Sequence, residues 1–414
     1  LKPILGYLML AAGAGVIVSN LDPLGKMIEH GFHITGVVPN NEAIVAVAQK
    51  VLGVETMSIL VVGLLMNLLI ARFTKFKYVF LTGHHSLFMA CLMSAVLGTA
   101  GLSGIELILV GGFLMGAWSA ISPAIGQSYT SKVTDGDEIA LGHFGSLGYY
   151  LSAWVAKYVG KAEESTEDIE IPEKWGFLRD STLSTALTMI VFYLIAAIAA
   201  GSEFVSTLSG SMSPYLFAVM SAMNFAVGVA IVYSGVRMIL GDLIPAFQGI
   251  ATKIIPNAIP AVDCAVFFTY APTAVVLGFI SSFIGGIIGM LILGAVGGVL
   301  IIPGLVPHFF CGATAGIYGN ATGGRRGAAV GAFLNGLAIT FLPALALPVL
   351  GQLGFQNTTF GDADFAVMGL VLGNAFEWIG MAGIYGVVVI AALVLIIPNF
   401  IKTKGKVINY VEEE

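Results

Sequence analysis

Ionisable side chains that interrupt long apolar runs are the strongest candidates for chemistry in this chain. His84 and His85 lie in the segment LTGHHS, His143 lies in ALGHFGS, and Asp263 lies in IPAVDC. Each segment holds a glycine or a proline, residue types that break or bend helices. An ionisable group inside an apolar run of membrane-spanning length costs several kcal/mol, so each of these residues is a functional hypothesis by default.

The chemistry that these residue types favour is hydrogen bonding to a ligand rich in hydroxyl groups. An imidazole donates at one ring nitrogen and accepts at the other, and a carboxylate accepts hydroxyl hydrogens. Nearby aromatic residues, Phe88, Phe144, Tyr149 and Tyr150, offer ring faces for stacking on a sugar, the alternative being that they belong to the core or face lipid. Thr82, beside the histidine pair, and His308, after the helix-breaking Pro307, complete the candidate set. The alternative for each histidine is a purely structural bond to a backbone carbonyl.

Other kinds of functional site leave no signal in the sequence. Cys91, Cys264 and Cys311 show neither metal-ligand spacing nor a disulfide framework, and we interpret them as small buried hydrophobes. No Walker motif, nucleophile elbow or HExxH motif occurs, and no basic stripe indicates nucleic-acid binding. The sequence therefore predicts no metal, no cofactor, no nucleic-acid partner and no catalytic residue.

The elements that must position the candidate residues are membrane helices. Hydrophobic residues make up 57% of the chain and charged residues only 10%, whereas a water-soluble domain carries roughly 25% charged residues. Lipid must therefore be the solvent. The sequence predicts an all-α polytopic membrane protein with about 10–11 transmembrane segments. Their expected positions are Ile4–Ser19, Met57–Ala71, Tyr78–Leu97, Ile105–Ile121, Ile139–Tyr158, Leu183–Ala200, Pro214–Leu240, Val262–Leu293, Val299–Tyr318, Ala328–Leu350 and Phe365–Ile397.

Several of these segments are interrupted. Three prolines lie in Gly241–Pro260, and Pro303 and Pro307 break another run. The last run, Phe365–Ile397, is too long for one simple span, so part of it should be tilted or re-entrant. Broken backbone at membrane depth is tolerated only where protein or a water-filled cavity covers it, so broken helices indicate a substrate site.

Basic residues and a weak internal repeat indicate the organisation of the chain. The clusters Arg72–Lys77, Lys157–Arg179 and Lys402–Lys406 should lie in the cytoplasm by the positive-inside rule. The mixed-charge part of the second cluster joins two membrane halves, residues 1–180 and 181–414. Similar segments in the two halves favour an inverted repeat around a midplane site. The chain opens at Leu1 in apolar sequence, and we expect further residues to precede it.

Short stretches along nearly the whole chain carry a family resemblance. They are Leu81-Thr82-Gly83-His84, Val133-Thr134-Asp135-Gly136 with Gly142-His143, Gly160-Lys161 through Glu167-Asp168, Gly235-Val236-Arg237-Met238, Ala261-Val262-Asp263-Cys264-Ala265, Ala271-Pro272 with Ala274-Val275-Val276, and Leu300-Ile301-Ile302-Pro303-Gly304. Together they resemble the ascorbate-type membrane component, subunit IIC, of the bacterial sugar phosphotransferase system.

This resemblance implies a homodimeric permease of the bacterial cytoplasmic (inner) membrane. Each protomer would have about eleven transmembrane segments, divided into a V-shaped dimerisation domain and a core domain that binds the sugar, and the family's first span would precede Leu1. Rigid-body motion of one domain against the other would carry the sugar across. A separate IIB protein would phosphorylate the sugar in the cytoplasm, so this membrane subunit needs no phosphoryl-accepting residue of its own.

The resemblance also assigns site residues and leaves the substrate open. His84, His143 and Asp263 fall on family substrate-site positions. The family has serine at the position of Ala14 and glutamine at those of Phe88 and Phe144, so the hydrogen bonding to a ligand must differ here. Ascorbate, another acidic sugar and a sugar alcohol therefore stay open as substrates.

Two other functional classes remain as alternatives. An ion-coupled secondary transporter of a small polar solute would also need broken helices and buried polar groups. An intramembrane enzyme is disfavoured, because the sequence offers no paired nucleophile and base. Dependence of uptake on phosphoenolpyruvate distinguishes a phosphotransferase-type permease from an ion-coupled transporter.

Overall fold

The computed structural model describes residues 2–33, 35–37, 39, 41–136, 139–169, 181–253, 255–351 and 359–400. Within these ranges the chain is mostly helical, as the composition predicted. The helices are α1 (Lys2–Gly31), α2 (Asn41–Phe73), α3 (Gly83–Thr99), α4 (Gly104–Val133), α5 (Ser146–Val159), α6 (Ser181–Ala200), α7 (Ser202–Ser209), α8 (Pro214–Lys253), α9 (Pro272–Ala295), α10 (Leu305–Gly351), α11 (Ala363–Ile379) and α12 (Met381–Ile396). Two short 3₁₀ helices, Cys264–Thr269 and Ile397–Asn399, and three short strands complete the description.

The strands are the main departure from the predicted all-α architecture. They are β1 (Tyr78–Phe80), β2 (Ala140–Leu141) and β3 (Ile259–Val262), and they form one parallel sheet in the order β1–β3–β2. Each strand begins or immediately precedes a run that we predicted to be a single helical span. The β-branched and aromatic residues of β1 and β3 favour extended backbone, and Pro260 within β3 disfavours a helix.

Six described helices are long and apolar enough to cross a membrane, or seven if the bent pair Thr185–Ala200 and Ser202–Ser209 counts as one span. This number is below the predicted 10–11 partly because strands consume the start of two predicted segments. Three of the other described helices, α3, α5 and α11, have only 17, 14 and 17 residues, whereas a membrane crossing needs about 20.

The longest helix, α10, accounts for another part of the difference. Its backbone leaves helical geometry at Gly323 and at Gly324, where φ is 59°. Gly319 and Gly327 then lie so close that a side chain on either would collide with the other's backbone, at 2.4 Å. The two arms on either side of this break correspond to the separately predicted segments Val299–Tyr318 and Ala328–Leu350.

The last apolar run also breaks, as its length indicated. Helix α11 ends and α12 begins around Gly380, whose φ of 63° suits glycine better than any residue with a side chain. The prediction that Phe365–Ile397 is not one simple span is therefore confirmed.

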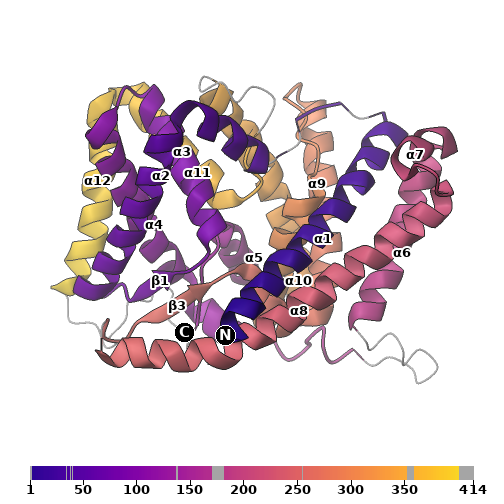
Figure 1. Cartoon of the computed structure of the whole chain (residues 1–414), viewed down its shortest axis with the longest axis horizontal. Coiled ribbons are helices and arrows are strands. Elements are labelled where there is room, and N and C mark those ends of the chain that lie inside the picture. The colour runs from indigo at the N-terminus through magenta and orange to yellow at the C-terminus, as the bar shows by residue number, and fades with distance from the viewer. Residues whose placement is uncertain are drawn as a thin grey trace.

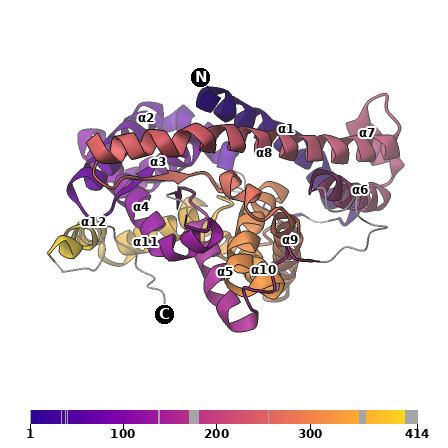
Figure 2. The ribbon, with the colours of Figure 1, turned by 90° about the horizontal axis from the view of Figure 1, so that it is seen from below.

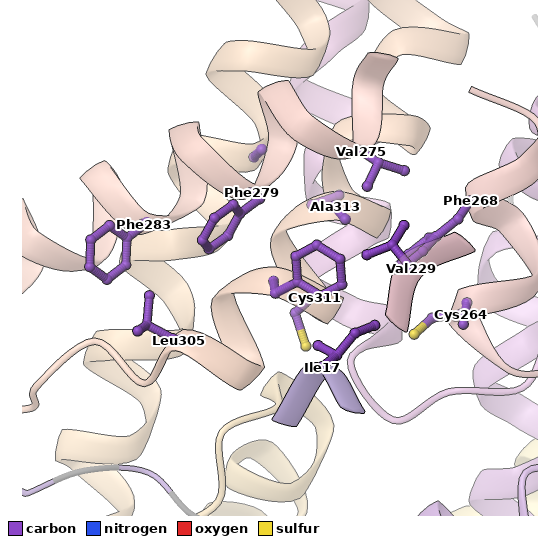
Figure 3. Packing of buried hydrophobic residues seen from close by; sticks show 14 of the residues in the cluster. Ile17, Val229, Cys264, Phe268, Val275, Phe279, Phe283, Leu305, Cys311 and Ala313 are labelled. Carbon is purple, nitrogen blue, oxygen red and sulfur yellow. The ribbon is translucent and has the colours of Figure 1, made fainter. Parts of the chain in front are cut away.

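The described helices surround two large apolar clusters, and a third, small one contains Ala71, Val79, Ile255 and Ala258. One large cluster lies among α1, α5, α6, α8, α9 and α10, and the other among α2, α3, α4, α11 and α12. Figure 1 shows α2, α3, α4 and α12 at one end of the molecule and α6 and α7 at the other, and Figure 2 shows α8 running along much of its length. Cys264 and Cys311 lie in the first cluster (Figure 3), and all three cysteines are buried and free, which confirms their interpretation as buried residues.

The small sheet lies between these two clusters. Ala140 and Ala261 belong to the second cluster, while the following residues, Leu141 and Val262, belong to the first. Successive side chains of a strand point to opposite faces, so one short sheet can contact both cores. The end of the sheet is therefore fixed relative to both groups of helices.

Candidate functional site

The parallel sheet brings three distant segments of the chain to one edge. Tyr78 pairs with Ile259, and Ala140 pairs with Ala261, so β3 lies between β1 and β2. The carboxyl ends of parallel strands lie on the same side, where ligands bind in many open sheets. His84 lies four residues after the end of β1, His143 lies two residues after β2, and Asp263 follows β3 directly.

Close backbone approach is what allows β2 to join this edge. The N–H of Gly142 donates to the carbonyl of Val262 at 2.7 Å, and the N–H of Leu81 donates to that of Ala261 at 2.9 Å. A side chain on Gly142 would meet the carbonyl oxygen of Ala261 at 2.3 Å. Only glycine fits at this position without displacing a strand.

A cavity of about 580 Å³ opens at this edge. Five residues singled out in the sequence line it: His84, His85, Phe88, His143 and Asp263. The opposite wall comes from α1, α8 and the start of α10, and the remaining lining residues are Gly15, Val18, Ser19, Asn41, Val232, Ala265, Val306, Pro307, Phe310 and Asp362. The structure thus brings together residues that the sequence could only nominate separately.

Four other nominated residues have different positions. Phe144 is fully buried and stacks on Phe80 at 4.5 Å between ring centroids, behind the cavity wall. Thr82 is buried, and its hydroxyl has no hydrogen-bond partner within the described ranges. His308 is 2% exposed and its Nδ1 is 2.9 Å from the Ser282 hydroxyl, so it joins α9 to α10. The side chain of Ala14 lies outside the described side chains.

Hydrogen bonds fix the tautomer of two cavity histidines. The N–H of Phe144 donates to Nδ1 of His85 at 3.2 Å, and the N–H of Gly145 donates to Nδ1 of His143 at the same distance. The Tyr149 hydroxyl also contacts Nδ1 of His143, at 2.9 Å. A backbone amide can only donate, so both Nδ1 atoms are acceptors and the hydrogen of each neutral ring is on Nε2. Each ring therefore keeps an N–H donor for a ligand.

Two carboxylates supply acceptors in the same cavity. Asp263 Oδ1 accepts the N–H of Ala265 at 3.0 Å, and its Oδ2 lies 3.4 Å from Nε2 of the half-exposed His84. Asp362, which our sequence analysis missed, accepts from the Asn41 amide at 2.6 Å and from the Cys311 thiol at 2.9 Å. The signal was available: GDAD, residues 361–364, places two carboxylates directly before an apolar run.

Asp364 anchors the site without lining it. Its carboxylate accepts from the Ser146 hydroxyl at 2.7 Å, the N–H of Leu147 at 3.0 Å and the Trp118 indole at 3.1 Å. These bonds cap the first turn of α5, which begins three residues after His143. Asp364 thereby fixes α4, α5 and α11 to one another beside the cavity.

The cavity also contains groups of the types that bind metals. Candidate ligand atoms of His85, His143 and Asp362 lie within 4.8 Å of one another, and so do those of His143, Asp263 and Cys264. A metal-bound histidine normally donates from its second nitrogen. Here Nδ1 of His85 and of His143 accepts hydrogen bonds instead, so Nε2 holds the hydrogen and has no free lone pair. The donor set therefore suits an oxygen-rich ligand better than a cation.

Comparison with known proteins adds two findings. The model of a protein family described as "PTS system sugar-specific permease component" (EIIC-GAT) matches residues 1–364. The chain is also similar to the "Ascorbate-specific PTS system EIIC component" of Mycoplasma pneumoniae (strain ATCC 29342 / M129 / Subtype 1), with 25% identity over 382 residues. That alignment covers 78% of this chain and 57% of the relative, so the chain spans just over half of the relative's length.

Proposed function

Because the chain belongs to the EIIC-GAT family of sugar-specific permease components of the phosphotransferase system (PTS), we propose that it binds and translocates L-ascorbate or a related sugar. A separate cytoplasmic IIB protein phosphorylates the sugar and so drives its accumulation. Ascorbate enters this proposal through the name of the Mycoplasma relative, which is 25% identical.

The observation that carries the proposal is the meeting of His84, His143 and Asp263 at one cavity. The chain segments that follow the three strands place these residues at the same edge of the sheet. Helices α1, α8 and α10, which belong to the first apolar cluster, form the opposite side of the cavity. Such a site, formed by irregular backbone between membrane helices, has the form expected of a transporter binding site. Its Nε2–H donors and carboxylate acceptors match the hydroxyl groups of a sugar.

The architecture supports a division into a dimerisation domain and a core domain. Helices α1, α6 and α8 pack together, and Gly13 of α1 and Gly228 of α8 approach so closely that neither tolerates a side chain. We assign these helices to the V-motif and the sheet with its following helices to the core. Since α1 belongs to residues 1–180 and both α6 and α8 to residues 181–414, the two sequence halves interleave.

The cavity lies where these two proposed domains meet. Gly15, Val18 and Ser19 of α1 and Val232 of α8 face the histidines and Asp263 across it. Rigid-body motion of one domain against the other would therefore open the cavity to one side of the membrane and then to the other. The protein works as a homodimer in the bacterial cytoplasmic membrane, and apolar side chains exposed along α2, α6 and α12 contact lipid.

The deciding experiment measures transport with a defined energy source. Right-side-out vesicles containing the protein are loaded with the soluble PTS proteins, including IIB, and with phosphoenolpyruvate, and labelled ascorbate is added outside. We expect accumulation only when phosphoenolpyruvate and IIB are present, and only as the phosphate ester. Accumulation of unmodified sugar driven by an ion gradient would instead establish the alternative, an ion-coupled secondary transporter.

A further inference from the structure

A second cavity adjoins the first on the side of α1. Its volume is about 350 Å³, and it shares Val18, Asn41, Val306 and Pro307 with the site cavity. Three charged residues of α1 line it: Asp22, Lys26 and Glu29. The two cavities therefore form adjacent parts of one space between α1 and the start of α10.

Carboxylates outnumber cations along the walls of this space. Asp263 and Asp362 line the inner cavity, and Asp22 and Glu29 line the outer one. Lys26 is the only lysine or arginine among the described lining residues, and it is already paired with Asp22 at 2.7 Å. The described lining residues therefore carry a net negative formal charge, which lowers the local concentration of anions.

The inner histidines do not offset this charge. Nδ1 of His143 lies 4.0 Å from Oδ1 of Asp362, a separation that would suit an ion pair if the ring were protonated on Nδ1. That nitrogen instead accepts the N–H of Gly145, so it has no hydrogen to share with Asp362. Nδ1 of His85 is likewise an acceptor. Both rings act as neutral donors.

Within the described part of the chain, the other sources of positive charge at the cavity are too small to reverse this balance. The first turn of α3, which contains His84 and His85, has no side-chain cap, and a helix N-terminus is equivalent to about half a positive charge. A proton on His84 would be shared with Asp263, 3.4 Å away. Among the described residues, these contributions together fall short of the formal charge of Asp263 and Asp362.

Asp362 is held in a position where it can contact a ligand. Its side chain is 6% exposed, and that exposed part faces the cavity. Asn41 and Cys311 each donate one hydrogen bond to it, whereas an ionised carboxylate offers about four acceptor sites. The unused sites can accept hydrogen from a hydroxyl group but can only repel a second anion.

We propose that Asp362 is a ligand-binding carboxylate and that its charge, added beside that of Asp263, makes this cavity select uncharged, hydroxyl-rich sugars over sugar anions. The inference rests on the proposed function, since it takes this cavity to be the sugar site. Among the substrates that the family resemblance leaves open, it favours a neutral sugar or sugar alcohol over the ascorbate anion.

The test compares two ligands that differ mainly in charge. L-Ascorbate is an anion at neutral pH, and L-gulono-1,4-lactone is its uncharged, saturated analogue. Equilibrium binding of each to the purified full chain in detergent needs no other PTS protein. We expect the lactone to bind more tightly, and we expect Asp362→Asn to shift the preference toward ascorbate by about tenfold.

Matched variants separate the role of this carboxylate from general effects of charge. Asp168→Asn removes the same charge from an exposed position in the segment 160–169 and should leave the preference unchanged. Asp263→Asn should shift the preference in the same direction as Asp362→Asn. It replaces Asp362→Asn as the test variant if Asp362→Asn does not fold. Thermal melting of each variant identifies the folded ones.

The outcomes distinguish this inference from its premise. Tighter binding of ascorbate than of the lactone by the unmodified protein, or a preference that neither aspartate substitution shifts, would overturn the inference and leave the proposed function standing. A folded protein that binds neither ligand would overturn both.

Discussion

At the scale of single residues, several polar side chains that face the cavity are held by hydrogen bonds from groups behind them. The backbone amides of Phe144 and Gly145 orient His85 and His143, and the amide of Ala265 orients Asp263. Such support fixes which atom of each side chain is left for a ligand. A substitution can therefore be designed to change the ligand affinity while keeping the hydrogen bonds that stabilise the fold.

The first prediction concerns Asp263→Asn. The asparagine oxygen can still accept the N–H of Ala265, so the fold should persist, while the cavity loses one carboxylate acceptor. Loss of one buried polar contact costs about 1–3 kcal/mol, which corresponds to roughly 5- to 150-fold weaker binding of an uncharged sugar. Calorimetric titration measures the affinity and thermal melting the stability. Unchanged affinity in a folded variant would remove Asp263 from the site.

The second prediction contrasts two phenylalanines that occupy glutamine positions of the ascorbate-type family. Phe88 lines the cavity, so Phe88→Gln should change the relative affinities for different sugars. Phe144 packs against Phe80 outside it, so Phe144→Gln should leave these ratios unchanged and destabilise the fold by about 3 kcal/mol, since it buries an amide in an apolar cluster. Competition binding and melting of both variants test the contrast, and a sugar preference altered by Phe144→Gln would contradict it.

At the scale of elements, three short strands rather than helices place the functional side chains. The third prediction is that Gly142→Ala destabilises the protein and weakens ligand binding, because its methyl group would press on the Ala261 carbonyl and displace β2 or β3. Overpacking of this kind costs about 1–3 kcal/mol. Gly83→Ala is the matched control at the same edge, because a side chain there meets nothing within 4 Å. Equal losses of melting temperature in the two variants would argue against a close strand contact at Gly142.

At the scale of the whole molecule, the fourth prediction concerns orientation in the membrane. The basic residues of the segment 157–179 predict that it lies in the cytoplasm. All three native cysteines are buried, so a membrane-impermeant thiol reagent should react with introduced cysteines over a low background. Asp168→Cys should be protected in intact cells and react in inverted vesicles.

Ser211→Cys is the control for this labelling. Ser211 lies in the exposed turn between α7 and α8, beyond the end of α6 opposite to Ser181. It should react from outside intact cells. Labelling of Asp168→Cys from outside would reverse the assigned orientation.

The sequence by itself determined the solvent and most of the candidate chemistry. A chain with 10% charged residues cannot cover its surface with polar groups in water. Ionisable residues in membrane segments are costly and are therefore usually retained for a function, which singled out His84, His143 and Asp263 beside helix breakers. The length of the apolar run Phe365–Ile397 also predicted that it is not one simple span, because the number of residues that crosses a membrane does not depend on distant parts of the chain.

Only the tertiary structure decided which of the candidates meet. Strand pairing such as Tyr78 with Ile259 joins segments far apart in the chain, and no local pattern specifies that partner. The fold also places Phe144 against Phe80, and it brings in Asp362, whose partner Asn41 belongs to the opposite end of the sequence. Hydrogen bonding also set the histidines as neutral donors. Whether an imidazole donates or accepts depends on the group behind it, and that group is known only after folding.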